Sequence, residues 1–368
     1  MNWQNELKNS ITTVEQLCQY VDLSEEEKKN ISELMLRFPM SITRHYMNLI
    51  DWKAPNDPLR KIVVPCATEF NVEGLLDTSG EAENTKIQGL QHKYKPTALM
   101  LSTNACASYC RFCFRKRMVG LTQDEIVKRV DDVARYLSEH PEIDNVLVSG
   151  GDALMNNNNL IRHILNHLTS IDSIQYVRFG SRMLSVLPQR LMDPELLEIF
   201  NEFSQKKGLY IVTHFEHPRE ITPDAIEAID LLKRQGGVAL KNQTVLLRGV
   251  NDSPTVLAEL MTKLTVCGIS PYYVFQCRPV SGVKKQFQVP LAEGYKIVDE
   301  AKKHMSGLAK QFRFGMSHAT GKIEIIGMLE GEKMLFKYHE AKNLEDNARI
   351  FTADVSNGKA WLTEEDVK

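Results

Sequence analysis

The sequence lacks several features that would assign it to a broad class of protein. No apolar run approaches the length needed to span a membrane. Acidic and basic residues nearly balance, with a formal net charge of −2, so no broad basic face for nucleic acid is expected. The first residues are polar and lack the apolar centre of a signal peptide. These absences predict a cytoplasmic globular protein that binds neither nucleic acid nor membranes.

Cysteine is scarce as well. The chain has seven cysteines, an odd number without secretory context, which indicates a reducing compartment rather than a disulfide framework. Three of them lie within eight residues of one another. The other four are scattered, and we expect them to be small buried hydrophobes; they are Cys18, Cys66, Cys267 and Cys277.

The three neighbouring cysteines, Cys106, Cys110 and Cys113, have x3 and x2 spacing. An iron–sulfur cubane normally takes four thiolates, one per iron. No histidine lies between His92 and His140 to supply a fourth ligand. The loop therefore predicts a [4Fe–4S] cluster with one open iron. A zinc site, which usually has four N/S ligands, and three ordinary core thiols are the alternative interpretations.

From residue 97 onward, short apolar strands alternate with amphipathic helices. Such repeats indicate a parallel sheet with right-handed crossovers. Six units favour an α/β fold with a partial, open (β/α)6 barrel, and a doubly wound open sheet is the alternative. The predicted strands are 97–103, 145–148, 174–179, 209–213, 244–247 and 270–275. The predicted helices are 123–140, 160–168, 195–203, 222–235, 254–266 and 292–305.

The segments on both sides of this barrel have a different texture. Residues 1–95 contain amphipathic helices and a loop-rich stretch, so we expect a helical N-terminal extension that wraps on the barrel of residues 96–306. Residues 307–368 contain short strands around glycine turns. We expect them to form a small C-terminal cover with β structure over the barrel mouth, with strands at 313–316, 322–326 and 333–338.

A second motif, Gly150, Gly151 and Asp152, follows the second predicted strand. Adjacent glycines let the backbone approach a ligand closely. A plain strand-to-helix turn would also use these residues. Together with the cysteine spacing one unit earlier, the motif resembles the radical SAM superfamily, in which S-adenosylmethionine (SAM) chelates the open iron. The resemblance implies that the three residues bind the amino end of SAM's methionine and that Phe112 packs near the adenine.

The sequence is further similar to the lysine 2,3-aminomutase family over nearly its full length. The resemblance implies two cofactors besides the cluster, SAM and pyridoxal phosphate (PLP). In that family the reduced cluster cleaves SAM to a 5′-deoxyadenosyl radical, and an amino group moves from C2 to C3 of an amino acid. An electron-donating reductase, flavodoxin or ferredoxin is implied as a partner, and so is homo-oligomerisation. The matching stretches are DPLRK (57–61), CRFC (110–113), LVSGGDAL (147–154), GSR (180–182), LPQR (187–190), THF (213–215) and NQTVLLRGVND (242–252).

PLP needs a lysine whose amine can form a Schiff base. The family carries this catalytic lysine in a glycine-rich turn near the C-terminus, and Lys322 after Gly321 is the match, without the family's longer glycine run. By the same resemblance, Lys93 replaces an arginine near the PLP phosphate and Thr97 replaces a second one. Gln243 is implied as a further cofactor-binding residue. A surface lysine in a β-turn is the alternative interpretation of Lys322.

At the substrate end, Arg115 matches the arginine that holds the substrate carboxylate by a bidentate pair. Lysine-using members hold the distant ammonium of lysine with two acidic side chains, which would fall at Arg278 and at about Gly315. Neither position is acidic here. We therefore expect a substrate with an acidic or polar side chain, glutamate first, that pairs with Arg278. The alternative is that Arg278 forms a structural ion pair.

The family's C-terminal zinc-binding cysteines have no counterpart, because Cys277 is the last cysteine, so no structural zinc is expected. His214 and His217 lie at a strand end, where we expect them to line the pocket or make hydrogen bonds rather than bind a metal. Two other functions fit the same residues. One is a radical SAM enzyme without PLP, and the other is a non-catalytic iron–sulfur protein.

Overall fold

A single curved sheet dominates the computed structural model, which describes residues 3–121 and 124–368. In the described residues twelve strands follow one another across this sheet in chain order. Strands β3 to β9 pair in parallel, while β1 and β2 at one edge and β10 to β12 at the other pair antiparallel. The bounds are Thr85–Ile87, Leu90–Tyr94, Thr97–Thr103, Asn145–Gly150, Tyr176–Ser181, Gly208–Thr213, Ala239–Leu246, Ser270–Gln276, Arg313–His318, Gly321–Met328, Lys333–Ala341 and Ile350–Asp354 for β1 to β12.

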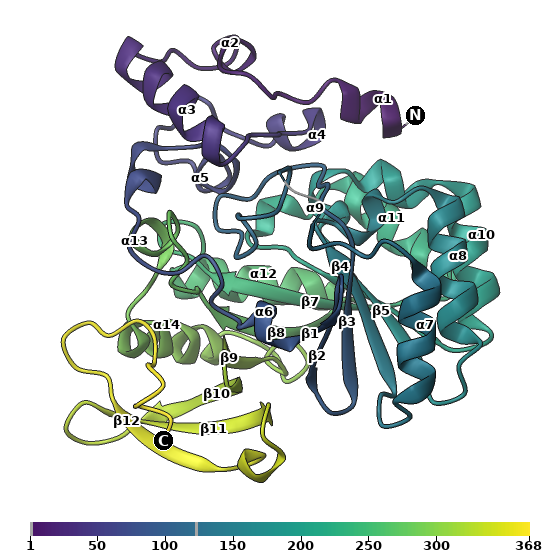
Figure 1. Ribbon diagram of the computed structural model, residues 1–368. Coiled ribbons are helices and arrows are strands. Elements are labelled where there is room, and N and C mark those ends of the chain that lie inside the picture. Colours follow the sequence, from purple (N-terminus) through teal and green to yellow (C-terminus); the bar gives the residue numbers. More distant parts are fainter. Residues whose placement is uncertain (1–2, 122–123) are drawn as a thin grey trace.

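Helices connect the parallel strands and lie along the outer side of the sheet (Figure 1). Because the strand order never reverses, the fold has no switch point of the doubly wound kind, and the partial barrel is confirmed. The crossover helices are α7 Val130–Glu139, α8 Asn158–Thr169, α10 Pro194–Ser204, α11 Pro223–Arg234, α12 Pro254–Val266 and α14 Leu291–Lys303, and the short helices α9 Met183–Val186 and α13 Lys284–Phe287 lie between them.

The predicted helix 123–140 is too long at its start. Residue 123 lies outside the described residues, and α7 begins only at Val130. Before it, the chain runs along the edge of the barrel, where the amide of Val127 donates to the carbonyl of Leu101 (2.8 Å). A backbone hydrogen bond to a strand therefore replaces the helical bond that the apolar periodicity of this stretch suggests.

The sheet curves until its two antiparallel edges approach each other. The Lys93 amine on β2 donates to the carbonyl of His318 at the end of β9 (2.7 Å). The Lys322 amine on β10 lies 4.9 Å from the ring centroid of Tyr94 on β2. Strands β9 to β12 thus continue the barrel sheet beyond β8, with β9 parallel to β8. The curvature places residues from both ends of the sheet in one interior.

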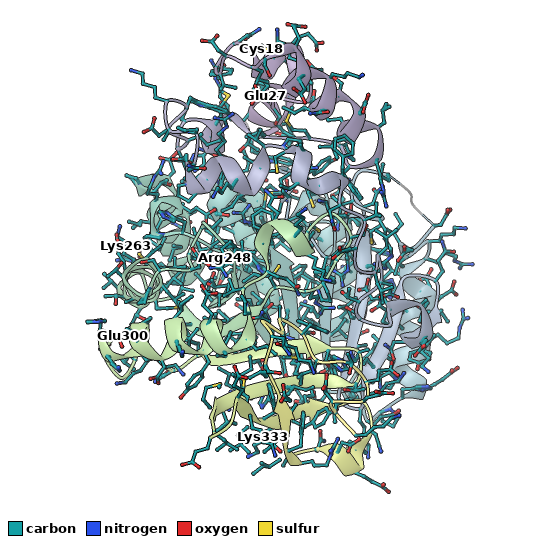
Figure 2. All side chains as sticks on the ribbon, turned by 90° about the vertical axis from the view of Figure 1, so that its left-hand side faces the viewer. Cys18, Glu27, Arg248, Lys263, Glu300 and Lys333 are labelled. Atoms are coloured by element: carbon teal, nitrogen blue, oxygen red, sulfur yellow. The ribbon has the colours of Figure 1, made fainter. Side chains whose placement is uncertain are left out.

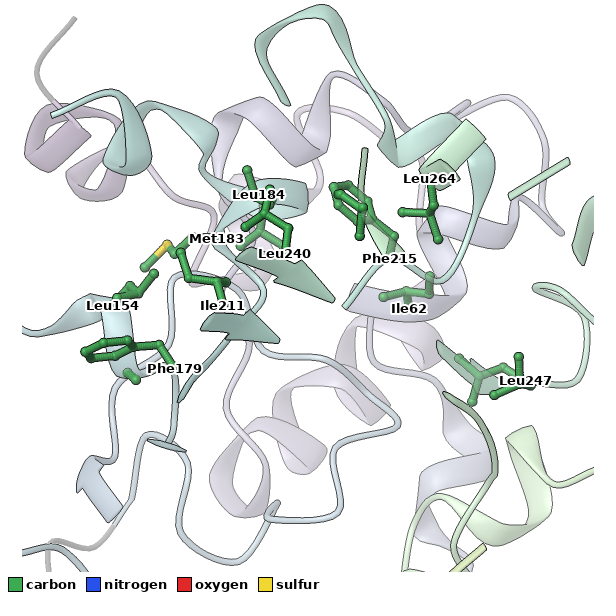
Figure 3. Packing of buried hydrophobic residues seen from close by; sticks show 14 of the residues in the cluster. Ile62, Leu154, Phe179, Met183, Leu184, Ile211, Phe215, Leu240, Leu247 and Leu264 are labelled. Carbon is green, nitrogen blue, oxygen red and sulfur yellow. The ribbon is translucent and has the colours of Figure 1, made fainter. Parts of the chain in front are cut away.

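The core fills the space between the strands and the outer helices. Phe179 of β5, Ile211 of β6 and Leu240 of β7 come from neighbouring strands and are almost fully buried (Figure 3). Leu184 of α9 packs in the same cluster. Ile62 of the N-terminal extension also belongs to it, so the extension shares the barrel's core.

The N-terminal extension is made of short helices, and its main helix α3 begins with a reciprocal cap. The Ser24 hydroxyl accepts from the Glu27 amide (3.2 Å), and the Glu27 carboxylate accepts from the Ser24 amide (2.8 Å). Glu27 marks this end of the molecule in Figure 2, with Lys333 of β11 at the other. The bounds are Trp3–Lys8, Val14–Leu17, Glu25–Arg37, Arg44–Met47, Pro58–Val63 and Glu81–Asn84 for α1 to α6.

No helix in the described ranges is both long enough and apolar enough to cross a bilayer. We propose a division of the chain into an extension (1–95), a barrel (96–306) and a C-terminal segment (307–368). The sheet runs across both boundaries, since β2 pairs with β3 and β9 pairs with β8.

Candidate active site

The three neighbouring cysteines form the loop that follows β3. The Cys113 amide donates to the carbonyl of Cys110 (3.1 Å), which makes the loop turn tightly. All three side chains are partly buried free thiols. Burial raises their pKa values, to about 11 for Cys110, and Cys113 adds to the increase at both Cys106 and Cys110. Without a metal they are neutral thiols, and a bound metal would deprotonate them.

Two arginine residues direct N–H groups at these sulfurs, one from its side chain and one from its backbone. A guanidinium nitrogen of Arg182 lies 3.0 Å from Cys110 Sγ, and the Arg115 amide lies 3.3 Å from Cys113 Sγ. In the described part of the chain no three His, Cys, Asp or Glu side chains gather around a point where one metal ion could sit. Thiolates of a cubane bind separate irons. A three-thiol loop with N–H donors aimed at its sulfurs fits the expected cluster.

The end of β4 packs directly against the cysteine loop. The Gly151 amide donates to the carbonyl of Thr103 (2.6 Å), and the Asp152 amide donates to that of Ala105 (2.8 Å). A Cβ on Gly150 would lie 2.1 Å from the Thr103 oxygen, and Gly150 has a φ of +126°. A Cβ on Gly151 would lie 2.2 Å from the Ala105 oxygen. The two glycines are therefore needed to join β4 to the loop.

Asp152 links this junction to the next strand end. Its carboxylate accepts from the amides of Leu154 (3.0 Å) and Arg182 (2.6 Å), and burial raises its pKa. The Arg182 guanidinium then contacts the ring of Phe112, at 5.7 Å from the centroid, and the carboxylate of Glu220. Phe112, Asp152 and the cysteine loop are thus brought together.

A buried carboxylate near this loop has a free acceptor atom. Glu216 follows β6, and its Oε2 accepts from the Val245 amide (2.7 Å). Among the described residues its Oε1 has no hydrogen-bond partner, and it lies 3.6 Å from Nδ1 of His214. Burial raises the Glu216 pKa. An unpaired buried acceptor beside the cysteine loop is compatible with a ligand that brings a hydrogen-bond donor, as SAM would.

The two histidines of this strand end make local contacts. His217 Nδ1 accepts from the Arg219 amide (3.2 Å). His214 faces Glu216. Neither belongs to a candidate metal group within the described ranges. Gln243 lies on β7, partly buried, two residues before Val245.

The residues predicted for PLP meet where the sheet edges approach. Lys322 Nζ donates to Glu340 (2.5 Å) and lies 4.9 and 5.9 Å from the ring centroids of Tyr94 and Tyr273. Lys93 donates only to carbonyl oxygens, of His318 (2.7 Å) and Ser79 (3.4 Å). Burial, with Arg278 and Lys322 nearby, lowers the Lys93 pKa to about 7.

This arrangement suits an anionic group such as a phosphate at Lys93, because a partly buried ammonium without a carboxylate partner calls for an anion. The second predicted phosphate position, Thr97, supplies no positive charge. Its hydroxyl accepts a hydrogen bond from Asn145 Nδ2 (3.0 Å).

The two predicted substrate arginines both contact the ring of Phe114. The guanidinium carbons of Arg115 and Arg278 are 4.6 and 4.5 Å from its ring centroid. Arg278 donates to the hydroxyls of Thr78, Ser79 and Ser317. Among the ion pairs of the described residues none involves Arg278, so the alternative of a structural ion pair is not supported.

The position of the second acidic residue in lysine-using members cannot carry one here. Gly315 and Lys322 line the same small cavity. A Cβ on Gly315 would lie 2.5 Å from the carbonyl oxygen of Ile323.

The pKa of Arg278 is lowered to about 10. Burial is the largest cause, the nearby Arg115 lowers this pKa further, and Glu81 opposes the change.

Four residues that sequence reasoning did not assign contact this site. They are Glu81, Tyr94, Arg182 and Glu216. Arg182 and Glu216 follow strand ends, where ligand sites gather in open α/β barrels, and this position was the available signal. Glu81 lies in a polar stretch with no such signal.

Comparison with known proteins agrees with the resemblance. The family model of the radical SAM superfamily matches residues 100–261. The chain is 42% identical over 344 residues to a putative L-lysine 2,3-aminomutase from Aquifex aeolicus. The aligned region covers 93% of this chain and 91% of that protein. It is 38% identical over 309 residues to L-lysine 2,3-aminomutase from Clostridium subterminale, covering 83% and 73%.

A third relative has a different substrate in its name. The chain is 35% identical over 310 residues to glutamate 2,3-aminomutase from Clostridioides difficile, covering 84% of this chain and 72% of that protein. These matches span both the cysteine loop and most of the rest of the chain. The chain is therefore an isomerase that belongs, within the radical SAM superfamily, to the lysine 2,3-aminomutase family.

Proposed function

We propose that this aminomutase uses PLP and moves the amino group of an acidic amino acid, glutamate first, from C2 to C3. The observation that carries the proposal is the pair of guanidinium groups that both contact the ring of Phe114. Guanidinium groups bind carboxylates bidentately, so Arg115 and Arg278 suit the two carboxylates of such a substrate. The relative named glutamate 2,3-aminomutase supports this substrate class.

When bound, SAM on the cluster supplies a radical that removes and returns a hydrogen atom, and PLP supplies the electron sink for amino-group migration. The chain's residues hold and orient these groups. Cys106, Cys110 and Cys113 would bind three irons, with the fourth left for SAM. Gly150, Gly151 and Asp152 fix the cysteine loop against β4, with Phe112 alongside.

Lys322 would carry PLP, with Lys93 and Gln243 as further contacts and the Lys93 ammonium directed at the phosphate. In the protein without PLP the Lys322 amine donates to Glu340 Oε2, 2.5 Å away, a contact that PLP would have to replace. Tyr94 and Tyr273 flank the amine and leave an aromatic wall against which a planar ring could pack.

The proposal is tested on anaerobically reconstituted protein by the absorbance of lysine-bound PLP, compared with that of Lys322→Ala. We expect a band in the parent that is lost in the variant. Incubation with SAM, reductant and glutamate should then yield β-glutamate by NMR. A parent without the band would contradict PLP dependence, and a loaded enzyme inactive on acidic amino acids would contradict the substrate class.

A second candidate is a radical SAM enzyme without PLP. Two observations favour it: Lys322 is engaged by Glu340, and Thr97 supplies no second phosphate-binding cation. This enzyme would cleave SAM reductively but show no PLP band. The electron donor and the oligomeric state are proposed as for the family, a reductase or a flavodoxin or ferredoxin and a homo-oligomer.

A further inference from the structure

Residues 77–84, here called the strap, cross the interior beside the two substrate arginines. Before the strap, Leu75 forms a β-bridge with Val280, with Leu75 N donating to Pro279 O (3.1 Å). After it, the chain enters β1. The strap is folded onto Asp77, whose carboxylate accepts from three strap amides, those of Ser79, Glu81 and Ala82.

Glu81, near one end of the strap, forms an ion pair with Arg115. Nε of Arg115 donates to Glu81 Oε1 (2.9 Å), and Arg115 Nη2 lies 2.9 Å from the same oxygen. The remaining Nη1 of Arg115 donates to the Ser149 hydroxyl (3.0 Å). Glu81 Oε2 accepts from Arg117 (2.6 Å). A side-chain carboxylate therefore holds the guanidinium that is proposed for the substrate's α-carboxylate.

Thr78 and Ser79, at the other end of the strap, contact the remaining cations, Arg278 and Lys93. The hydroxyls of Thr78 and Ser79 accept from Arg278, and the Ser79 carbonyl accepts from Lys93. These neutral acceptors satisfy Arg278 without neutralising its charge. Thr78, Ser79 and Glu81 of the strap thus contact Arg115, Arg278 and Lys93, the three cations that are proposed to bind anionic groups of substrate or PLP.

We propose that the strap is an internal ligand that the substrate displaces, and that it selects amino acids carrying two carboxylates. The inference rests on the proposed function. A dicarboxylic amino acid replaces Glu81 at Arg115 and the strap hydroxyls at Arg278 in one event. An amino acid with a neutral side chain also has to displace Glu81, but it brings no carboxylate to Arg278, which keeps only the Ser317 hydroxyl of its three hydroxyl acceptors when the strap moves. Leaving a buried charge unpaired is costly, so such a ligand binds weakly.

Glutamate and glutamine are matched probes, because they differ only in the charge of the side-chain end group. In PLP-loaded protein we expect glutamate to accelerate backbone hydrogen exchange at Glu81 and Ala82, whose amides Asp77 holds in the free protein. Glutamine at an equal concentration should leave this exchange unchanged. Slower or unchanged exchange with glutamate bound would overturn the inference.

The variant Glu81→Gln tests the selection itself. It releases Arg115 while the strap hydroxyls stay on Arg278, so glutamine should gain affinity, and the preference for glutamate over glutamine should fall roughly tenfold. Glu125→Gln is the control, because Glu125 pairs with Arg117 and does not contact Arg115. It should keep the parent's preference. If both variants keep that preference, Glu81 is only a scaffold. If Glu81→Gln does not fold, hydrogen exchange at Glu81 and Ala82 of the parent decides whether the substrate displaces the strap.

These readouts separate the inference from the proposed function. The PLP band and calorimetric binding of glutamate report on the function alone. If both are present and strap exchange does not accelerate, only the strap inference fails. If glutamate does not bind, the acidic-substrate proposal fails and the strap inference fails with it.

Discussion

At the scale of single residues, the charge of Lys93 changes near neutral pH. Its pKa is lowered to about 7 by burial and by the nearby Arg278, Lys322 and Lys342, with Glu81 opposing. An anion that binds the protonated amine should bind most tightly below pH 7 and lose affinity as the pH rises through that value. Sulfate, whose charge does not change in this range, titrated by calorimetry on either side of pH 7 would show this trend.

Two variants make the Lys93 test specific. Lys93→Arg keeps its charge, so the affinity for sulfate should no longer fall near pH 7. Lys93→Met should weaken sulfate binding below pH 7, where the parent amine is charged, and should remove the pH dependence. The pKa of the neighbouring His318 is lowered to about 4, so this histidine stays neutral through the range. An unchanged pH dependence in Lys93→Arg would assign the titration to another group.

Arg278 determines the preferred substrate in the proposed function. Replacing it by methionine should cost about 2–5 kcal/mol of glutamate binding, because the side-chain carboxylate loses its proposed cationic partner there. Glutamine should bind more tightly than to the parent, because no buried charge is then left unpaired when the strap moves, and the PLP band should persist, since Arg278 is not the PLP lysine. Calorimetric titration of both amino acids measures the difference. Equal losses for glutamate and glutamine would mean that the arginine supports the site generally.

Sequence reasoning located the cysteines and the Gly150–Asp152 motif because their spacing and their places after strands are local features. It did not find Glu81. The surrounding polar residues are typical of a loop, and the partner of Glu81, Arg115, is brought to it only by the curvature of the sheet. The orphan acceptor of Glu216 is likewise a property of three-dimensional packing.

At the scale of elements, the junction of β4 with the cysteine loop depends on a glycine. Gly151→Ala would place a Cβ 2.2 Å from the Ala105 oxygen, so the loop must shift. We expect roughly 3 kcal/mol of lost stability and a lower iron content after reconstitution. Gly307→Ala is the control, since a Cβ at that position would have no atom of the described residues within 4 Å. Normal iron content in Gly151→Ala would show that the loop tolerates the shift.

The buried strands could be predicted because apolar β-branched runs mark them, and β3 agrees at both ends with its prediction. Strands β1, β2 and β12 were missed. Strand β12 is a short edge strand that exposes Ile350, Thr352 and Asp354. Strands β1 and β2 are short and mostly polar, with Lys93 of β2 facing the site. Strand β7 begins earlier than predicted, at Ala239, for the same reason: Lys241 and Gln243 interrupt its apolar pattern.

At the scale of the whole molecule, the extension is joined to the cysteine loop by a buried carboxylate. Glu69 accepts from Arg111 (2.7 Å) and Lys116 (2.6 Å), and all three side chains are almost fully buried. Glu69→Gln should destabilise the protein by about 3–5 kcal/mol, because both cations lose their counter-charge. Denaturant unfolding measures this change. The control Glu73→Gln removes a surface pair with Lys284 and should have no measurable effect.

If Glu69→Gln were as stable as the parent, the extension would be held mainly by apolar packing, as that of Ile62 in the barrel core. The sequence could predict that residues 1–95 are helical and loop-rich. It could not predict this attachment, because Glu69, Arg111 and Lys116 each resemble an ordinary surface charge in isolation.

The unbroken chain order of the sheet has a consequence for biosynthesis. Each strand pairs with the one made just before it, so the sheet can grow in the direction in which the ribosome delivers the chain. The cysteine loop and the β4 turn that packs on it are complete while β10 has yet to emerge. Iron and sulfur can therefore be inserted while the later strands are still being made, whereas a group carried by Lys322 has to wait until β10 has been made.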